Sequence, residues 1–176
     1  CCSASKNGYV LTIDTSRQYP YIIDCNSEMT EYYDCNGNLA KIVDHQGFET
    51  LITYANKLIT ITDTVSGKKI YLEKDSCCRV IRVYDNTTRE VKLTYSDDFL
   101  TSICDVNGHS LFYAYDEDGR ITSGTDSLGT RYFENTYDEC GRVLTQKDAL
   151  NHISYFDYCE DSCENCYGDT RITTNR

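Results

Sequence analysis

The sequence predicts an all-β protein, built as an array of β-hairpins that forms a twisted or spiralling sheet. The chain has 16 Tyr, no Trp and one Pro, and tyrosine-rich composition favours strands. The phrase Asp-x-x-Gly, typical of tight turns, occurs many times. It returns on a period of about 21 residues, and a fixed period indicates a repeat architecture.

The repeated phrase is clearest in two copies, residues 115–121 (YDEDGRI) and 137–143 (YDECGRV). Each copy is followed by an aspartate at the same offset from its aliphatic residue. The candidate structural positions are therefore Tyr115, Asp116, Gly119, Arg120 and Asp126 in one copy, and Tyr137, Asp138, Gly141, Arg142 and Asp148 in the next.

Weaker copies extend this register from Glu31 to Tyr158. The first copy keeps Tyr33, Asp34 and Gly37, and two others keep the tyrosine as Tyr54 and Tyr95. The copy after Asp63 departs, with Lys74-Asp75 in place of Tyr-Asp.

Each repeat is predicted to run strand, turn, strand, turn. The turn aspartate bonds the backbone two residues on, and glycine accepts the positive φ that such turns need. Apolar residues stand two positions before several tyrosines, at Ile52, Leu93, Tyr113 and Phe156, whereas Glu31 and Asn135 break the pattern. Spacing by two places them on one strand face. We therefore expect Tyr54, Tyr95, Tyr115 and Tyr137 to be mostly buried and stacked in a file.

The phrase Y-D-x-x-G-R-[apolar]-x4-D-x2-G resembles the YD repeat of the RHS family, which includes bacterial polymorphic toxins, toxin-complex shell proteins, wall-associated proteins and teneurins. The resemblance implies a ribbon of β-hairpins that spirals into a hollow shell. It also implies a non-enzymatic structural segment of a shell that encloses or displays a toxin or other C-terminal domain. The family's self-cleaving, Pro- and Asp-rich core is missing, since the single proline is Pro20.

The chain divides into three predicted regions. Because it begins without Met, we interpret it as a piece of a longer protein. Residues 1–30 are entry strands or degenerate repeats, with strands at residues 9–14 and 19–24. Residues 31–158 are the YD-repeat array, and residues 159–176 are an acidic, Cys-rich tail. An uncapped strand edge offers free backbone groups. We expect self-association through the terminal strands, or a tail that folds back over the edge.

Charge and hydropathy restrict the partners. The net charge of −11 argues against nucleic acid and anionic membranes. No 18-residue apolar run exists, so no membrane span is expected. The expected partners are neighbouring repeats of the parent protein. The resemblance implies a secreted or cell-surface bacterial protein, and the alternative function is a cell-surface module that binds carbohydrate or protein.

The 11 cysteines are an odd number, so at least one has no internal partner, and mostly free thiols are expected. Cys159, Cys163 and Cys166 have the spacing of the iron–sulfur loop of radical SAM enzymes, but those enzymes carry it early in an α/β barrel. As a zinc site they need a fourth ligand, His152 or Cys140. A structurally incidental run is the favoured interpretation, so no cofactor or metal is predicted.

The remaining polar positions are interpreted as structural, and no enzyme is predicted. The turn aspartates could bind calcium, but turn chemistry accounts for them. Arg120 and Arg142 are expected to pair with turn aspartates across the ribbon. His109 and His152 follow second turns without a nucleophile signature beside them.

Overall fold

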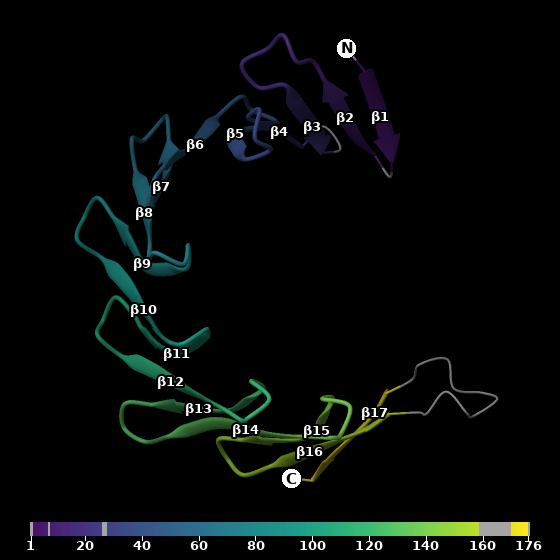
Figure 1. Ribbon diagram of the computed structural model, residues 1–176, viewed down its shortest axis with the longest axis vertical. Coiled ribbons are helices and arrows are strands. Elements are labelled where there is room, and N and C mark those ends of the chain that lie inside the picture. The colour runs from purple at the N-terminus through teal and green to yellow at the C-terminus, as the bar shows by residue number, and fades with distance from the viewer. Residues whose placement is uncertain (1, 7, 26–27, 159–169, 176) are drawn as a thin grey trace, which may run out of the picture. The chain divides into compact units, whose positions relative to one another are not determined.

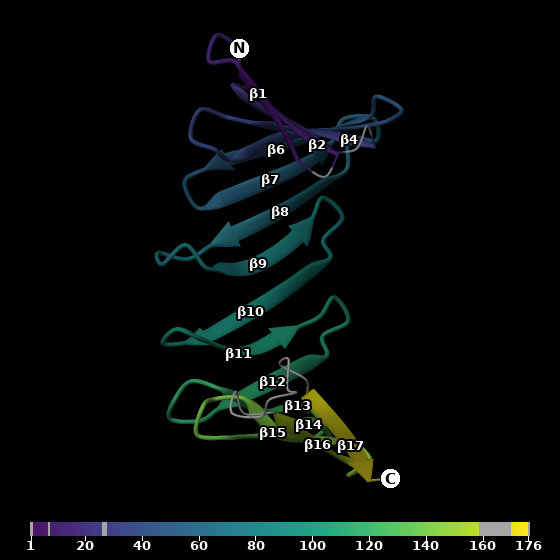
Figure 2. The same cartoon turned by 90° about the vertical axis from the view of Figure 1, so that its right-hand side faces the viewer.

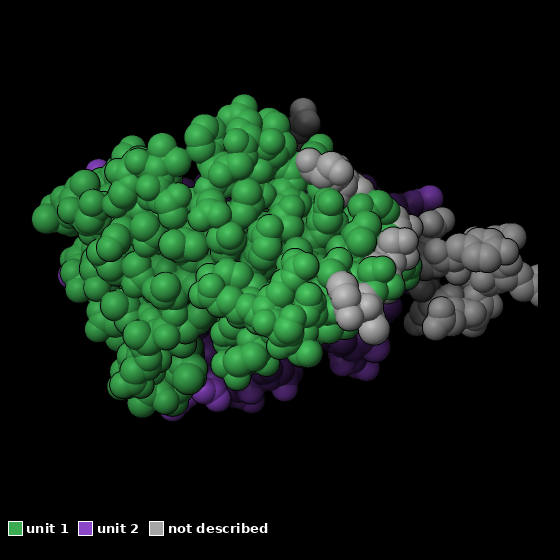
Figure 3. Space-filling model, turned by 90° about the horizontal axis from the view of Figure 1, so that it is seen from above, with its two compact units in different colours: residues 1–90 green, residues 91–176 purple. Residues whose placement is uncertain are grey.

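The computed structural model describes residues 2–6, 8–25, 28–158 and 170–175 (Figure 1). These residues form 17 β-strands and no helix, which confirms the all-β prediction. None of them forms a helix that is long and apolar enough to cross a membrane. The chain divides into two compact units, unit 1 (Cys1–Glu90) and unit 2 (Val91–Arg176), which are coloured separately in Figure 3.

Every described strand of each unit is antiparallel to the next strand along the chain. The strands of unit 1 are β1 (Cys2–Lys6), β2 (Tyr9–Ile13), β3 (Tyr21–Cys25), β4 (Met29–Tyr33), β5 (Leu39–Asp44), β6 (Glu49–Ala55), β7 (Leu58–Asp63), β8 (Lys69–Lys74) and β9 (Val80–Asp85). Those of unit 2 are β10 (Glu90–Ser96, which starts at the boundary), β11 (Phe99–Cys104), β12 (Ser110–Tyr115), β13 (Ile121–Asp126), β14 (Arg131–Tyr137), β15 (Val143–Asp148), β16 (Ile153–Tyr158) and β17 (Thr170–Asn175).

One turn conformation makes most of the hairpins, and Asp116 illustrates it. Its Oδ1 accepts the backbone N–H groups of Asp118 (3.1 Å) and Arg120 (2.9 Å). Its carbonyl accepts the N–H of Gly119 at 3.0 Å, and its own N–H donates to the Arg120 carbonyl at 3.0 Å. The turn therefore satisfies its own polar backbone, which is why an Asp-x-x-Gly phrase alone specifies a hairpin.

The fourth position of this turn has a positive φ. Glycine fills it in most copies, for example Gly119 at +79°, and Asn151 fills it once at +68°. Cys78 (+65°) and Thr88 (+82°) take the same position without being glycine or asparagine. A residue with a side chain other than Asn or Asp is uncommon there, and the β-branched Thr88 still more so, so these two turns carry backbone strain that the glycine turns avoid.

Each unit is a sheet one layer thick. Its described strands contact only the strands next to them in sequence, so no second layer covers either face. The buried residues of the described chain are accordingly few: Pro20, Ile52, Gly124 and Asn135. The expectation of mostly buried tyrosines is wrong. Tyr54 is 45% exposed, and Tyr95, Tyr115 and Tyr137 are half-buried, because no described strand is stacked on the sheet.

The two faces of unit 2 still differ in polarity. Cross-strand partners share a face. The polar face carries Thr94 opposite Ser102 and Ser123 opposite Glu134, whereas the other face carries Leu93 opposite Ile103 and Ile103 opposite Leu111. Further along this face, Gly124 lies opposite Phe133, and a Cβ on Gly124 would come within 2.4 Å of the Phe133 ring. The missing side chain therefore makes room for the aromatic ring.

The ends of the chain add strands to both units. The two strands predicted within residues 1–30 form β2 and β3. At the other end, β17 pairs with β16 from Tyr158 opposite Thr170 to Ile153 opposite Asn175. Residues 170–175 thus fold back onto the edge of β16, in agreement with one of the two expected outcomes for the tail.

Candidate functional site: the joint between successive repeats

The hydroxyl of the motif tyrosine makes a hydrogen bond at the place where two neighbouring strands stop pairing through their backbones. Strands β11 and β12 pair only from Ser102 opposite Phe112 to Cys104 opposite Ser110. Beyond this stretch the strands diverge, and the Tyr115 hydroxyl donates to the Leu100 carbonyl at 2.8 Å. A side-chain hydrogen bond thus replaces the missing backbone bonds at the place where one repeat meets the next.

The same bond recurs at other joints in both units. Tyr54 donates to the Leu39 carbonyl at 2.9 Å, and Tyr158 donates to the Val143 carbonyl at 2.8 Å. Tyr137 makes the equivalent bond to Ile121. Each acceptor is the aliphatic residue that follows the first turn of the preceding repeat. The motif therefore contains both halves of a joint, the donor at its start and the acceptor at its end.

A second contact covers the tyrosine ring in unit 2. The covering residue is always the one just before the acceptor. The ring of Phe99 lies 4.9 Å from that of Tyr115, centroid to centroid. The Arg120 guanidinium lies 5.1 Å from the centre of the Tyr137 ring, and Arg142 lies 4.6 Å from that of Tyr158. Cation–π or ring contacts of this kind hold the next repeat against the turn. The motif tyrosines are therefore not stacked on one another in a file.

The covering arginines are held by their own turns. Arg120 Nε lies 2.7 Å from Asp116 Oδ2, and Arg142 Nε lies 2.8 Å from Asp138 Oδ2. The expected pairing with an aspartate across the ribbon is wrong, because Oδ1 is occupied by the turn and Oδ2 faces the residue four positions on. Arg120 does reach the next repeat through its Nη1, which donates to the Asp138 carbonyl at 3.4 Å.

These contacts shift the pKa values of the paired groups. The pKa of the Asp116 carboxyl is lowered, first because it accepts the Arg120 backbone N–H and further because of the Arg120 side chain. The Asp138 pKa is lowered in the same way by Arg142. The pKa of each arginine is raised, chiefly by its hydrogen bond to the aspartate. Both shifts favour the charged forms of the aspartate and the arginine in each turn.

Two second turns of unit 2 have histidine in the position of the arginine. His109 Nδ1 lies 3.4 Å from Asp105 Oδ2, and His152 Nδ1 lies 2.9 Å from Asp148 Oδ2. At Asp126 the same position is Thr130, whose N–H donates to Asp126 Oδ1 at 2.8 Å. The histidines thus occupy a position in the turn that is defined by the backbone.

The first repeat departs from the joint. The Asp34 turn is intact, with Gly37 at φ +80° and the Asn38 amide donating to Asp34 Oδ2 at 3.1 Å. The Tyr33 hydroxyl, however, donates to Glu31 at 2.7 Å. This hydrogen bond is the main reason why the pKa of Tyr33 is raised to about 12.

Two residues, Arg79 and Phe99, occupy the arginine position of a turn and were not predicted from the sequence to do so. The turn at Asp75, which the sequence presents as a departure, has the same conformation as the others. The Arg79 N–H donates to Asp75 Oδ1 at 3.0 Å, its Nη2 lies 2.8 Å from Oδ2, and Cys78 fills the glycine position. The Arg79-Val80 pair, which matches the Arg-aliphatic end of the repeated phrase, could have identified the Asp75 turn as a copy. Phe99 could not have been identified in this way, because it replaces the arginine of the phrase.

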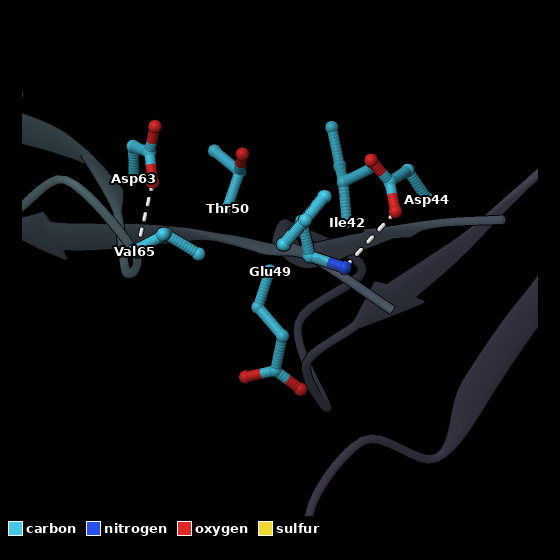
Figure 4. Close-up of a pocket in the computed structure, with 7 residues that line it drawn as sticks. Ile42, Asp44, Glu49, Thr50, Asp63 and Val65 are labelled. Atoms are coloured by element: carbon cyan, nitrogen blue, oxygen red, sulfur yellow. Dashed lines mark hydrogen bonds between the residues drawn. The ribbon is translucent and has the colours of Figure 1, made fainter. Parts of the chain in front are cut away.

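One depression lies on unit 1 between two second turns. It has a volume of about 400 Å³ and is lined by Ile42, Asp44, Phe48, Glu49, Thr50, Asp63 and Val65. Figure 4 shows Ile42 and Thr50 between the two aspartates, with Glu49 directed to the other side. Asp44 Oδ1 accepts the Phe48 N–H at 2.9 Å, and Asp63 Oδ1 accepts that of Val65 at 2.8 Å. The carboxylates there serve the turns.

Metal-ligating groups do not converge anywhere in the described part of the chain. The run Cys159, Cys163 and Cys166 lies outside the described residues. The described cysteines Cys25, Cys35, Cys77, Cys78, Cys104 and Cys140 are free thiols.

Comparison with known proteins agrees with the repeat interpretation. The Teneurin YD-shell family model matches residues 16–155, and no curated protein matches the chain. The fold is similar to a chain of the Photorhabdus luminescens Tc holotoxin pore, with 17% identity and a TM-score of 0.63 over 95% of this chain and 10% of that one. A crystal structure of TcdB2-TccC3-TEV gives 15% identity and a TM-score of 0.59 over 88% of this chain and 8% of that one.

This chain therefore spans only about a tenth of the length of the solved chains that it matches. At these identities the solved structures show the fold, whereas the family model covers most of the sequence, including the array of joints. The chain belongs to the Teneurin YD-shell family of YD-repeat proteins.

Proposed function

We propose that the chain is a non-enzymatic wall segment of a β shell, which encloses or displays a toxin or another C-terminal domain. The observation that carries this proposal is the joint. In each full repeat, the tyrosine hydroxyl bonds to the preceding repeat, the arginine covers the ring of the next tyrosine, and the turn aspartate holds that arginine within its own turn. The residues that define the motif thus hold a wall together.

The one-layer sheet supports the same function. A wall needs two faces and many equivalent units, whereas a globular domain needs a core, and the described chain has almost no fully buried side chains. Repeat arrays gain stability from the interfaces between adjacent units. The neighbouring repeats of a longer protein are therefore the partners that we propose, and we place that protein outside the cell or at its surface.

A surface module that binds carbohydrate or protein is the second candidate. It is favoured by exposed aromatic side chains on unit 2, Phe112, Tyr132 and Tyr155, which are 46%, 52% and 42% exposed. They lie on every second strand, β12, β14 and β16, however, so they do not form the continuous row of rings that a sugar-binding platform uses. The wall function is the better supported of the two.

Limited proteolysis of the full-length parent protein tests the proposal. We expect a domain C-terminal to the repeats to resist protease in the parent. It should become sensitive when Tyr115, Tyr137 and Tyr158 are all changed to Ala, because the wall then opens at three joints. Equal sensitivity in the unaltered parent would contradict an enclosing wall. Glycan or protein binding that is lost in the Phe112→Ala, Tyr155→Ala variant would favour the second candidate.

A further inference from the structure

The turns of unit 2 lie on two opposite edges of its sheet. Because consecutive strands are antiparallel, the turns after β10, β12 and β14 share one edge, and those after β11, β13 and β15 share the other. Figure 2 shows this alternation for the β11–β12 and β12–β13 turns, which lie on opposite sides. We call these the first-turn edge and the second-turn edge.

The first-turn edge is acidic. Its turns carry Asp97 and Asp98, then Glu117 and Asp118, then Glu139, all exposed. The Asp118 side chain, although it contacts Arg120, is 71% exposed. Like charges so close together repel any partner that is also acidic.

The second-turn edge carries exposed aliphatic side chains instead. Val106 is 52% exposed, Leu128 is 90% exposed and Leu150 is 74% exposed. The acidic groups of these turns are the capping aspartates. Their Oδ1 atoms are bound to backbone N–H groups, as Asp126 Oδ1 is to Leu128 N at 2.9 Å and Asp148 Oδ1 is to Leu150 N at 2.8 Å. Hydrogen bonds hold these aspartates in the turns, although the side chains of Asp105 and Asp148 are 45% and 50% exposed, and no other Asp or Glu lies in these turns.

Turn chemistry does not account for this choice of residue. Leu128 and Leu150 stand two positions after the turn aspartate. In turns of the same conformation on the first-turn edge, that position is Asp118 or Cys140. Since the backbone accepts a polar residue there, leucine has no local role. Large aliphatic groups exposed at repeated positions indicate a surface that another molecule covers.

The spacing and charge of the edge restrict its occupant. Turns on one edge are two strands apart, about 9.5 Å, so the aliphatic tips form a row with that period. A matching surface needs the same period and fewer acidic residues than the first-turn edge carries. The second-turn edge of another copy of the chain has both properties, whereas the first-turn edge has the period but not the charge.

We propose that two copies of this chain dock through their second-turn edges, with Val106, Leu128 and Leu150 of one copy lying between those of the other about a two-fold axis. Such an isologous contact is self-complementary by symmetry. Its area is small, so the dimer is weak. The net charge of −11 opposes it, and salt screens that repulsion, so the dimer strengthens as salt is added.

Sedimentation equilibrium of the whole chain over a range of protein and salt concentrations tests the proposal. In the variant that combines Leu128→Asp with Leu150→Asp, the dissociation constant should rise at least about tenfold. Cys140→Asp is the matched control for either single leucine substitution, since it adds one negative charge at the same turn position on the opposite edge. It should change the dissociation constant by less than about twofold. Both variants keep exposed positions exposed, and circular dichroism checks that they fold.

Three results would overturn the proposal. One is a strict monomer at every protein and salt concentration. Another is an equal effect of Cys140→Asp and of the double variant. The third is a dimer whose hydrogen exchange is slowed at residues 170–175 and not at the second-turn edge, which would indicate pairing through β17. If neutral phosphatidylcholine vesicles bind the monomer through Leu128 and Leu150, the edge is a lipid contact and the dimer is rejected.

Discussion

Tyr54 in unit 1 and Tyr137 in unit 2 make the same hydroxyl bond to the preceding repeat, yet their rings lie in different surroundings. Arg120 covers the ring of Tyr137. The residue in the matching position before Leu39 is Asn38, whose amide is bound to Asp34, and Tyr54 is 45% exposed. The hydroxyl bond therefore sets the position of the tyrosine, and the covering residue decides how much of the ring is shielded.

The repeat that ends at Lys74 extends this comparison. Its preceding turn is the short Asn56-Lys57 hairpin, which has neither the turn aspartate nor the arginine. The tyrosine is also missing, and the Lys74 N–H donates to the Lys57 carbonyl at 2.7 Å. A backbone bond thus replaces the side-chain bond where the cover is lost. The tyrosine at this joint is missing together with the turn that would have covered it.

Acid should have the largest effect, because it acts on the turns of both units together. The pKa values of the turn aspartates, such as Asp34, Asp116 and Asp138, are lowered by hydrogen bonds in the fold. The unfolded chain therefore binds more protons below about pH 4, and stability falls as the pH drops through the folded pKa values. Urea unfolding midpoints should be nearly constant above about pH 5 and fall steeply below about pH 4. A midpoint that is flat down to about pH 2 would contradict the role of the turns.

Removing a covered tyrosine should cost more than removing an uncovered one. Tyr115→Ala should lower the free energy of unfolding by about 2 to 3 kcal/mol, below the range for fully buried aromatic residues because the ring is half-buried. Tyr54→Ala should lower it by about 1 kcal/mol, mainly through the lost hydrogen bond. Urea denaturation measures both values. Equal losses would show that the cover contributes nothing.

Alanine substitutions at two glycines can distinguish the cost of backbone strain from the cost of lost packing at a joint. Gly119 and Gly108 have φ of +79° and +84°, but only at Gly119 would a Cβ come within 2.7 Å of the Phe99 ring. Gly108→Ala should cost about 1 kcal/mol for the left-handed conformation alone. Gly119→Ala should cost about 2 kcal/mol, since Phe99 must also move off Tyr115. In a Phe99→Leu background, Gly108→Ala and Gly119→Ala should lower the free energy of unfolding by the same amount.

A double-mutant cycle can measure the cover directly. The losses in stability caused by Arg120→Ala and Tyr137→Phe should not be additive. Tyr137→Phe removes the hydroxyl that binds the Ile121 carbonyl, so the ring that Arg120 covers is no longer held in place. Asn38→Ala and Tyr54→Phe should show no coupling, because the Asn38 amide is bound to Asp34. Equal coupling in both cycles, measured by thermal unfolding at constant pH, would remove the distinction between the two units.

The smallest effect concerns Tyr33, whose hydroxyl turns to Glu31 in place of the preceding repeat. Its pKa of about 12 lies above the ordinary value, so the neutral phenol stabilises the fold below about pH 10 and this contribution is lost as the pH rises toward 12. Ultraviolet titration should detect tyrosine ionisation that extends to about pH 12. In Glu31→Gln, Tyr33 should ionise earlier, while Glu28→Gln serves as the control.

The sequence alone determined the elements that depend on short-range contacts. An aspartate bonds backbone groups two and four residues away, so each Asp-x-x-Gly phrase predicts its own hairpin without reference to the rest of the chain. The period, the all-β class and the positions of Asp34, Gly37, Asp126 and Asp148 in turns follow from this local chemistry, and the structure has them there.

The tertiary structure decided what depends on residues about one repeat apart. Alternating apolar residues predict a buried face, but whether anything covers that face depends on a second layer, which the described strands of the two units do not form. The contact of Arg142 with Tyr158 joins residues 16 positions apart, and the sequence does not say which turn lies over which ring. The pairing of β17 with β16 likewise crosses residues 159–169, where no local turn signal connects the strands. Such contacts are set by how the hairpins twist and diverge, which the spacing of residues along the chain does not encode.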